Sequence, residues 1–255
     1  MKTEKKNILV SILVNNFNNE KYLDKCINSC LKQTYKNIEI IVFDDKSTDS
    51  SKNILNKYKK NKIKVIFNKK KKFNSGPLNQ LNSIYISLKK SKGKYIFLLD
   101  GDDYFLKDKV SQFVKTFNSK PKTIFLQDNP IYKYNAVNIQ LKKFKLKRKL
   151  FVNHTWPFFS PTSTMAFKRE FLVKLLAQIA FSRSLFDQMF FDARAFIYIY
   201  FFEENYIVSN KYLTVYNQNL EGDTLKNYKK KNKKWWIRRL QYHYYVKSIF
   251  ERNNK

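Results

Sequence analysis

The 255-residue chain is poor in several residue types, and each shortage narrows the structures and functions open to it. It has four glycines and neither a GxGxxG nor a GxxxxGK(S/T) pattern, so the usual dinucleotide-binding fold and the P-loop are unsupported. Its two cysteines, Cys26 and Cys30, lie on an apolar stripe with helical spacing and have no histidine or cysteine partners nearby. We expect two small buried thiols rather than a zinc or redox site.

Long apolar runs are also missing from the sequence. None approaches the roughly 20 residues that a membrane-spanning helix needs, and the densest is AFIYIYFF at 195–202. The basic N-terminus leads through an apolar run into NNFNNE and not into a small-residue cleavage site. We therefore expect no signal peptide and a cytoplasmic location.

Acidic residues are scarce, with 20 Asp and Glu against 51 Lys and Arg and a formal net charge of +31. Part of this excess is what an AT-rich genome produces, because Lys, Asn, Ile, Phe and Tyr are all abundant while Gly is rare. The remainder indicates an anionic partner: nucleic acid, an anionic membrane or an anionic substrate.

The first half of the chain alternates apolar runs with helical patterns. The runs at 8–14, 38–43, 64–67 and 94–99 predict buried strands, and strand–helix repetition predicts a mostly parallel sheet covered on both faces. Ligands of such sheets bind at the carboxyl ends of the strands. Polar clusters follow all four runs: NNFNNE, DDKSTD, NSGPLNQ and DGDD.

The second half is less regular. Residues 123–128 and 211–218 read as strands, and the alternating segment 132–151 predicts a hairpin. Residues 183–202 predict one helix, and the tail from Leu225 predicts a basic, aromatic helix.

The DGDD segment gathers three acids in a basic chain. Carboxylates two residues apart on a tight turn can bind one hard divalent cation, and Gly101 lets backbone and ligand approach closely. A cation held by few protein ligands completes its shell with phosphate and water, which suits a nucleotide diphosphate. The alternative is a solvated turn that caps the next helix.

In FDDKST, the carboxylates can accept hydrogen bonds from a base or ribose, or cap a helix through Asp45 or Ser47.

The order of these motifs resembles the opening of the family 2 glycosyltransferases. VSILVNNFNNEKYL is similar to their V-S-I-I-x-P-x-Y-N-x-E-x-Y-L, IVFDDKSTD to their I-V-V-D-D-G-S-x-D, and GKYIFLLDGDD to their G-e-Y-I-x-F-L-D-x-D-D. The similarity is close over residues 8–118 and loose beyond them. It implies the GT-A fold: an α/β domain with a Rossmann-like, mostly parallel central sheet, helices on both faces, a less regular acceptor-side half and a C-terminal helix.

The resemblance also implies an activity and a donor site. It predicts an inverting, metal-dependent transfer of a sugar from a nucleotide-sugar, expected to be a UDP-sugar, to a bacterial cell-surface glycan or lipid-linked acceptor. Asp102, with Asp100 as its partner, would bind Mn²⁺ or Mg²⁺ on the donor diphosphate. The other implied donor contacts lie at the strand ends: Asn15, Phe17, Glu20, Asp44, Asp45, Gly76, Asp100 and Asp103.

On the acceptor side the resemblance predicts a general base and a hydroxyl-rich strand. The family supplies the base as an Asp or Glu at the start of a helix, and Asp187 is our first choice with Asp192 as the alternative. Thr162, Ser163 and Thr164 would border the acceptor, ordinary strand packing being the competing interpretation.

Some positions depart from the family pattern. Lys46 stands where the family has the Gly of D-D-G-S. Asn217 and Asn219 replace the Arg and His of its Y-R-x-H segment, whose His helps to hold the metal. His243 is the candidate replacement, although a packed helix residue is the other interpretation, and His154 is a candidate for meeting the acceptor. The departure at Asn219 leaves a catalytically inactive family member open as an alternative.

We expect three parts in the chain: residues 1–118 as the nucleotide-sugar half, 119–224 as the acceptor-side half of the same domain, and 225–255 as a basic aromatic helix. This helix favours an anionic membrane surface as a partner, on the inner face of the cytoplasmic membrane. A nucleic-acid-binding protein is the competing class. It is disfavoured because the chain lacks a recognised binding motif and acids at the strand ends would repel phosphate.

Overall fold

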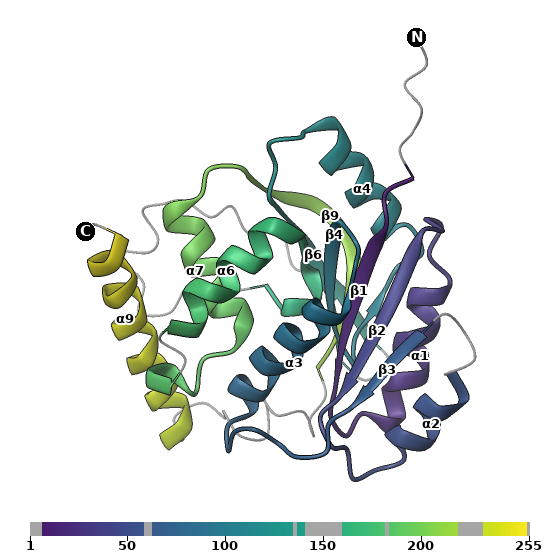
Figure 1. Ribbon diagram of the computed structural model, residues 1–255, viewed down its shortest axis with the longest axis horizontal. Coiled ribbons are helices and arrows are strands. Elements are labelled where there is room, and N and C mark those ends of the chain that lie inside the picture. Colours follow the sequence, from purple (N-terminus) through teal and green to yellow (C-terminus); the bar gives the residue numbers. More distant parts are fainter. Residues whose placement is uncertain are drawn as a thin grey trace.

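The computed structural model describes residues 7–58, 63–134, 137–140, 160–181, 184–218 and 232–253. Nine strands of these residues form one sheet in the order β3-β2-β1-β4-β8-β6-β9-β5, with β7 paired to β6 (Figure 1). The strands are β1 (Val10–Asn16), β2 (Ile38–Asp44), β3 (Ile63–Phe67), β4 (Tyr95–Asp100), β5 (Tyr104–Phe105), β6 (Phe125–Tyr134), β7 (Val137–Gln140), β8 (Met165–Lys168) and β9 (Tyr206–Asn217).

Helices cover the sheet on both faces, as the strand–helix alternation predicts. Residues of α1, α2 and α4 share one apolar core with one face of the strands, and residues of α3, α6, α7 and α9 share a second core with the other face. The helices are α1 (Glu20–Leu31), α2 (Ser51–Tyr58), α3 (Gly76–Lys90), α4 (Lys109–Ser119), α6 (Arg169–Phe181), α7 (Phe191–Phe202) and α9 (Lys233–Asn253), with 3₁₀ turns η1 (Thr162–Thr164) and η2 (Ser184–Phe186).

The first four strands are parallel and their carboxyl ends lie in register. Asn15 pairs with Phe43 on β2 and with Asp100 on β4, and Asp44 pairs with Phe67 on β3. The mostly parallel sheet is therefore confirmed, and the polar clusters that follow β1, β2 and β4 meet at one edge.

The second half extends this sheet with both antiparallel and parallel neighbours. β8 pairs antiparallel with β4, β6 antiparallel with β8, and β9 parallel with β6, with register shifts around Asn129. The predicted hairpin is confirmed where β6 and β7 pair, from Ile131 with Gln140 to Tyr134 with Val137. The rest of that segment, residues 141–151, lies outside the described residues.

The single helix predicted over 183–202 is wrong. The chain forms η2, turns, and begins α7 only at Phe191. The reason is Arg194, whose buried guanidinium donates to the carbonyls of Phe186 and Met189 and so holds the preceding turn against the helix. Periodicity alone could not place this break, because apolar residues continue across it from Phe186 through Met189 to Phe191.

The C-terminal segment forms the predicted helix over α9. It packs Tyr242, Tyr245 and Ile249 into the second core, beside α7 and η2. None of the helices within the described residues is long and apolar enough to cross a membrane.

Candidate functional site

The DGDD turn lies at the carboxyl end of β4, against the end of β1. The backbone N–H of Gly101 donates to the carbonyl of Asn15 at 2.8 Å. A Cβ at position 101 would lie 2.6 Å from Asn16 Oδ1 and 3.1 Å from the Asn15 carbonyl oxygen. Only glycine fits this approach without displacing its neighbours.

Asp100 is held by amide groups from two elements. Asn15 Nδ2 donates to its Oδ1 at 3.3 Å, and Gln80 Nε2 lies 3.2 and 3.3 Å from its two carboxylate oxygens. Burial raises the pKa of Asp100, and these hydrogen bonds oppose the rise. The carboxylate is thus fixed in position at the strand end.

Asp103 is a buried structural acceptor. Ser163 Oγ donates to its Oδ2 at 2.5 Å, and the backbone N–H of Asn217 donates to its Oδ1 at 2.9 Å. Burial raises the pKa of this carboxyl well above its usual range, and the nearby charges of Asp102 and Asp100 raise it further. Asp103 therefore ties the turn to η1 and to the end of β9.

Asp102 is half-buried between these two carboxylates. Burial, and then the charge of Asp100, raises its pKa to about 7. Its carbonyl accepts a hydrogen bond from the side chain of Asn217. Three desolvated carboxyls on one turn repel each other, and a divalent cation would relieve this repulsion.

The donor set of the turn fits a hard cation only in part. Asp100 and Asp102 offer carboxylate oxygens, the ligand type that Mg²⁺ and Mn²⁺ prefer. Across the described ranges, no group of three or more His, Cys, Asp and Glu side chains has the arrangement of a complete metal site. A cation at this turn would need further oxygens from phosphate and water.

Asp44 and Asp45 occupy different environments at the end of β2. Asp44 Oδ1 accepts from Asn16 Nδ2 at 2.8 Å and from Ser47 Oγ at 2.6 Å, so it holds the loop together. Asp45 accepts from Asn68 Nδ2 at 2.6 Å, and burial raises its pKa. Lys46, which follows Asp45 in the chain, has φ = 60°. A left-handed residue is therefore required where the family pattern has glycine.

Other predicted donor contacts surround these strand ends. Glu20 Oε2 accepts from the Ser50 N–H at 2.7 Å, which ties the start of α1 to the loop before α2. Phe17 is 43% exposed, and Lys71 Nζ lies 3.1 Å from the centre of its ring. Gly76 is exposed at the start of α3.

The three hydroxyl residues of η1 are buried and largely used inside the protein. Ser163 Oγ accepts from the Asp100 N–H at 3.0 Å besides donating to Asp103. Thr164 Oγ1 donates to the Pro161 carbonyl at 2.7 Å, and Thr162 Oγ1 lies 3.5 Å from Gln80 Nε2. Ser163 thus supports the DGDD turn, a role that its place in the sequence does not reveal.

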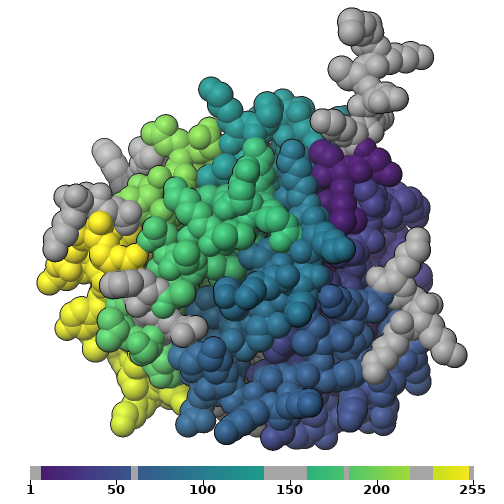
Figure 2. All heavy atoms as spheres, in the orientation of Figure 1, coloured from purple at the N-terminus to yellow at the C-terminus, as the bar shows by residue number. Residues whose placement is uncertain are grey.

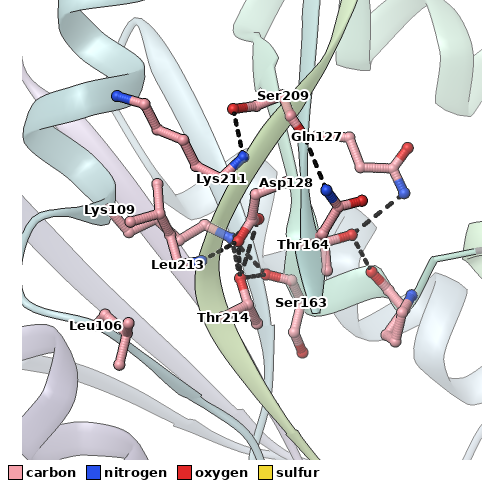
Figure 3. A network of polar contacts seen from close by, with 12 residues as sticks. Leu106, Lys109, Gln127, Asp128, Ser163, Thr164, Ser209, Lys211, Leu213 and Thr214 are labelled. Atoms are coloured by element: carbon pink, nitrogen blue, oxygen red, sulfur yellow. Dashed lines mark hydrogen bonds and ion pairs between the residues drawn. The ribbon is translucent and has the colours of Figure 1, made fainter. Parts of the chain in front are cut away.

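A buried ion pair contacts Ser163, the residue that holds Asp103 (Figure 3). Lys109 Nζ lies 2.7 Å from Asp128 Oδ1, and both side chains are fully buried. Lys109 also donates to the Ser163 carbonyl at 2.8 Å and to Thr214 Oγ1 at 2.5 Å. Asp128 Oδ2 accepts from the backbone N–H of Leu213 at 2.9 Å. The pair therefore joins α4, β6, β9 and η1, and no sequence signal pointed to it.

Asp187 lies in the turn before α7, with both carboxylate oxygens occupied. Gln241 Nε2 donates to Oδ1 at 2.7 Å and Gln188 Nε2 to Oδ2 at 2.8 Å. The helix break described above therefore separates Asp187 from the helix start where the family pattern expects the base.

Asp192 lies in the first turn of α7. Burial raises its pKa to about 6. The hydrogen bond that its Oδ1 accepts from the Ala193 N–H at 2.7 Å and the charge of Arg238 lower the pKa, and the charge of Asp100 raises it. Gln80 links this helix start to the DGDD turn, because its Oε1 accepts from the Phe191 N–H at 3.2 Å while its Nε2 faces Asp100. Asp192 is thus the carboxyl that the structure brings toward the turn.

The remaining candidates do not converge on this site. His243 is exposed on α9, with its ring against Tyr242. His154 and Asn219 lie outside the described residues. Cys26 and Cys30 are free thiols buried on α1, as expected.

Comparisons with known proteins place the chain in a family. The model of the glycosyl transferase family 2 matches residues 11–187. The chain is 40% identical over 121 residues to the Escherichia coli UDP-Glc:α-D-GlcNAc-diphosphoundecaprenol β-1,3-glucosyltransferase WfaP, covering 48% of this chain and 45% of that protein. It is 34% identical over 140 residues to the poly(ribitol-phosphate) β-glucosyltransferase of Bacillus spizizenii, covering 48% of this chain and 22% of that protein. The chain thus spans about half or less of the length of these curated relatives.

Solved structures share the fold at low sequence identity. The S. aureus TarS structure with UDP-GlcNAc has a TM-score of 0.62 at 21% identity, covering 86% of this chain and 61% of that chain. The mannosyltransferase PcManGT of Pyrobaculum calidifontis, in complex with GDP-Man and Mn²⁺, also has a TM-score of 0.62, at 16% identity, covering 96% of this chain and 64% of that chain. With a family match over more than half of its length, the chain belongs to glycosyl transferase family 2.

Proposed function

We propose that the protein is an inverting, metal-dependent glycosyltransferase that moves a sugar from a UDP-sugar to a lipid-linked or polymeric glycan of the bacterial cell surface. The names of its relatives support this acceptor class, one acting on a diphosphoundecaprenol-linked sugar and another on poly(ribitol-phosphate). The observation that carries the proposal is the DGDD turn, where three desolvated carboxyls meet at the carboxyl edge of a parallel sheet.

The residues of the turn divide the work. Asp102 and Asp100 would bind Mn²⁺ or Mg²⁺, which offsets the charge that develops on the leaving diphosphate. Asp103 keeps the turn in place through Ser163 and Asn217. Asp45 and Phe17 border the nucleoside side of the edge, where Asp45 can accept hydrogen bonds from base or ribose.

We assign the general base to Asp192 rather than to Asp187. An inverting transfer needs a carboxylate that takes the proton from the acceptor hydroxyl. Asp192 starts α7 and is joined to the DGDD turn through Gln80, and its raised pKa strengthens it as a base. The carboxylate oxygens of Asp187 already accept hydrogen bonds from two glutamines.

On the acceptor side, the residues of η1 support the DGDD turn and Gln80. Ser163 holds the metal turn from behind, and Thr162 is the hydroxyl of η1 that faces Gln80. A lipid-linked acceptor would bring the enzyme to the inner face of the cytoplasmic membrane.

The test measures transfer or hydrolysis of UDP-sugars with and without Mn²⁺, for the wild type, Asp102→Ala and Asp192→Asn. We expect activity to need the cation, and both variants to lose at least 100-fold in turnover. The matched control is Asp108→Ala, because Asp108 follows the same turn but makes no side-chain cap to α4. Metal-independent activity, or equal activity of wild type and Asp102→Ala, would contradict the role of the turn.

The two alternatives predict other outcomes of the same work. An inactive family member would bind a UDP-sugar, and this binding would raise the Tm of the protein. It would neither transfer nor hydrolyse the sugar. A nucleic-acid-binding protein would bind RNA tightly, with steep salt dependence, and would show no response to any sugar nucleotide.

A further inference from the structure

Helix α9 carries a row of large apolar side chains that point away from the protein. Trp236, Leu240 and Tyr244 are 58%, 56% and 58% exposed. They are four residues apart, so they form one continuous stripe along the helix. An exposed row of this kind marks an interaction surface rather than scattered surface residues.

The opposite face of α9 fixes the direction of this stripe. Tyr242, Tyr245 and Ile249 are almost fully buried in the second core, and Tyr245 stacks edge-on against Phe186 with ring centres 5.2 Å apart. Because the helix cannot rotate without exposing these residues, the stripe must face outward. Figure 2 shows α9 in yellow on the outer rim of the molecule, on the side away from β3.

Positive charge frames the apolar stripe. Lys233 and Lys247 are exposed seven residues on either side of Leu240, which puts them on the same helix face. The acid at this end of the helix, Glu251, lies 3.7 Å from Lys247. The sequence 226–234, KNYKKKNKK, has six lysines in nine residues, Lys233 among them. Aromatic and aliphatic side chains between lysines are typical of a helix that lies in the headgroup region of an anionic bilayer.

The inner side of α9 contacts the acceptor side of the site. Gln241 donates to Asp187 and accepts from the Gln188 N–H at 2.9 Å, and Arg238 Nε donates to the Gln188 carbonyl at 3.2 Å. The same loop continues into α7 and Asp192. The inner side of the helix therefore faces the loop that leads to the candidate base, and the charge of Arg238 acts on Asp192.

We propose that the outer face of α9, centred on Trp236, Leu240 and Tyr244 and flanked by Lys233 and Lys247, docks on an anionic phospholipid surface and turns the acceptor side of the site toward it. The docking surface follows from the exposure of the stripe and the charge around it. Its use in delivering a lipid-linked acceptor rests on the function proposed above. A second copy of the chain is a poorer occupant, because each copy carries a formal charge of +31 and would repel the other.

The test is co-sedimentation of the 255-residue chain with vesicles of phosphatidylcholine alone or with 30% phosphatidylglycerol. The stripe variant replaces Trp236, Leu240 and Tyr244 with serine. The matched control replaces Tyr85, Tyr134 and Val173 with serine, since these lie on other elements and are 51%, 47% and 53% exposed. Thermal unfolding checks that both variants are folded.

We expect the wild type and the control to bind the anionic vesicles, and the stripe variant to bind at least tenfold more weakly. Lys233→Glu/Lys247→Glu should also weaken binding, and neutral vesicles should bind much less protein than anionic ones. Equal binding by wild type and stripe variant, or no preference for anionic lipid, would overturn the proposal. The proposal would also be overturned if the stripe variant lost self-association or RNA binding while it bound vesicles as well as the wild type does.

Donor hydrolysis without vesicles separates this proposal from the enzymatic one. The stripe variant should hydrolyse UDP-sugars at the wild-type rate, because its substituted residues face away from the site. If the wild type binds vesicles through the stripe but never turns over a sugar nucleotide, the docking surface stands and the proposed activity fails.

Discussion

Replacing Lys109 with methionine removes the cation from a buried ion pair, and we expect a loss of about 3–5 kcal/mol in the free energy of unfolding. Lys109 and Asp128 are both fully buried, 2.7 Å apart. The variant leaves Asp128 charged or forces it to protonate, with only the Leu213 N–H and Thr214 Oγ1 as remaining partners. For a chain of this size the loss corresponds to a Tm lower by roughly 6–20 °C.

The pKa shifts of Lys109 and Asp128 explain why removing one partner of the pair destabilises the protein more than removing both. Burial lowers the pKa of Lys109 and raises the pKa of Asp128, in each case against the effect of the partner. Burial thus favours the neutral form of both groups. The double variant Lys109→Met/Asp128→Asn removes both charges and keeps an acceptor for Leu213 and Thr214. We expect it to be more stable than Lys109→Met alone by about 2 kcal/mol or more.

Urea unfolding followed by circular dichroism measures the wild type, Lys109→Met, Asp128→Asn and the double variant. Lys174→Met serves as the control, because Lys174 is 61% exposed and pairs with Glu203 at 3.7 Å, and we expect it to change stability by less than about 1 kcal/mol. If the losses in free energy of unfolding of the two single variants sum to the loss of the double variant, the two charges are not coupled. This result would contradict the prediction. The same holds if Lys109→Met costs no more than Lys174→Met.

Three further predictions concern the site. Gly101→Ala places a Cβ 2.6 Å from Asn16 Oδ1, so we expect a loss of about 1–3 kcal/mol in the free energy of unfolding. We also expect weaker UDP-sugar binding by titration calorimetry. Unchanged stability and binding would contradict the close packing at this position. The pH profile of kcat/KM should rise through about pH 6 as Asp192 ionises and should lose this limb in Asp192→Asn; a limb that persists assigns the base elsewhere. The sign for stability is the reverse, because a carboxyl with a raised folded-state pKa stabilises the fold most below its unfolded value of 3.8 and loses that contribution as pH rises toward 6. Lys46→Gly should raise stability by about 0.5–1 kcal/mol in urea titration, since Lys46 holds φ = 60°, and a loss would refute the idea of strain there.

Local patterns in the sequence were enough for the first half of the fold. Continuous apolar strands with polar residues at their ends predict a parallel sheet, and parallel pairing then places Asn15, Asp44 and Asp100 at one edge. The break between Asp187 and Asp192 could not be predicted in this way. It depends on where the buried guanidinium of Arg194 finds its carbonyl partners, which is a tertiary contact without a periodic signature.

Contacts distant in sequence explain what else was missed at the site. Ser163 reads as an ordinary strand hydroxyl until η1 is placed behind the DGDD turn. Lys109 and Asp128 look like surface charges in a chain rich in lysine, and only the packing of α4 against β6 and β9 buries them. Residue type fixed neither role, because the same side chains are common on surfaces.

The two residues that hold Asp103 have a consequence for how the protein is made. Ser163 lies 60 residues after Asp103 in the chain, and Asn217 lies 114 residues after it. At a synthesis rate of about 5–20 residues per second, roughly 6–23 s pass between translation of the turn and of its last partner. The parallel strands and the contacts of Asp100 with Asn15 and Gln80 can form early on the ribosome, but Asp103 lacks its partner Asn217 until β9 emerges. The acidic turn, which is the proposed cation site, is thus among the last parts of the nascent chain to be completed.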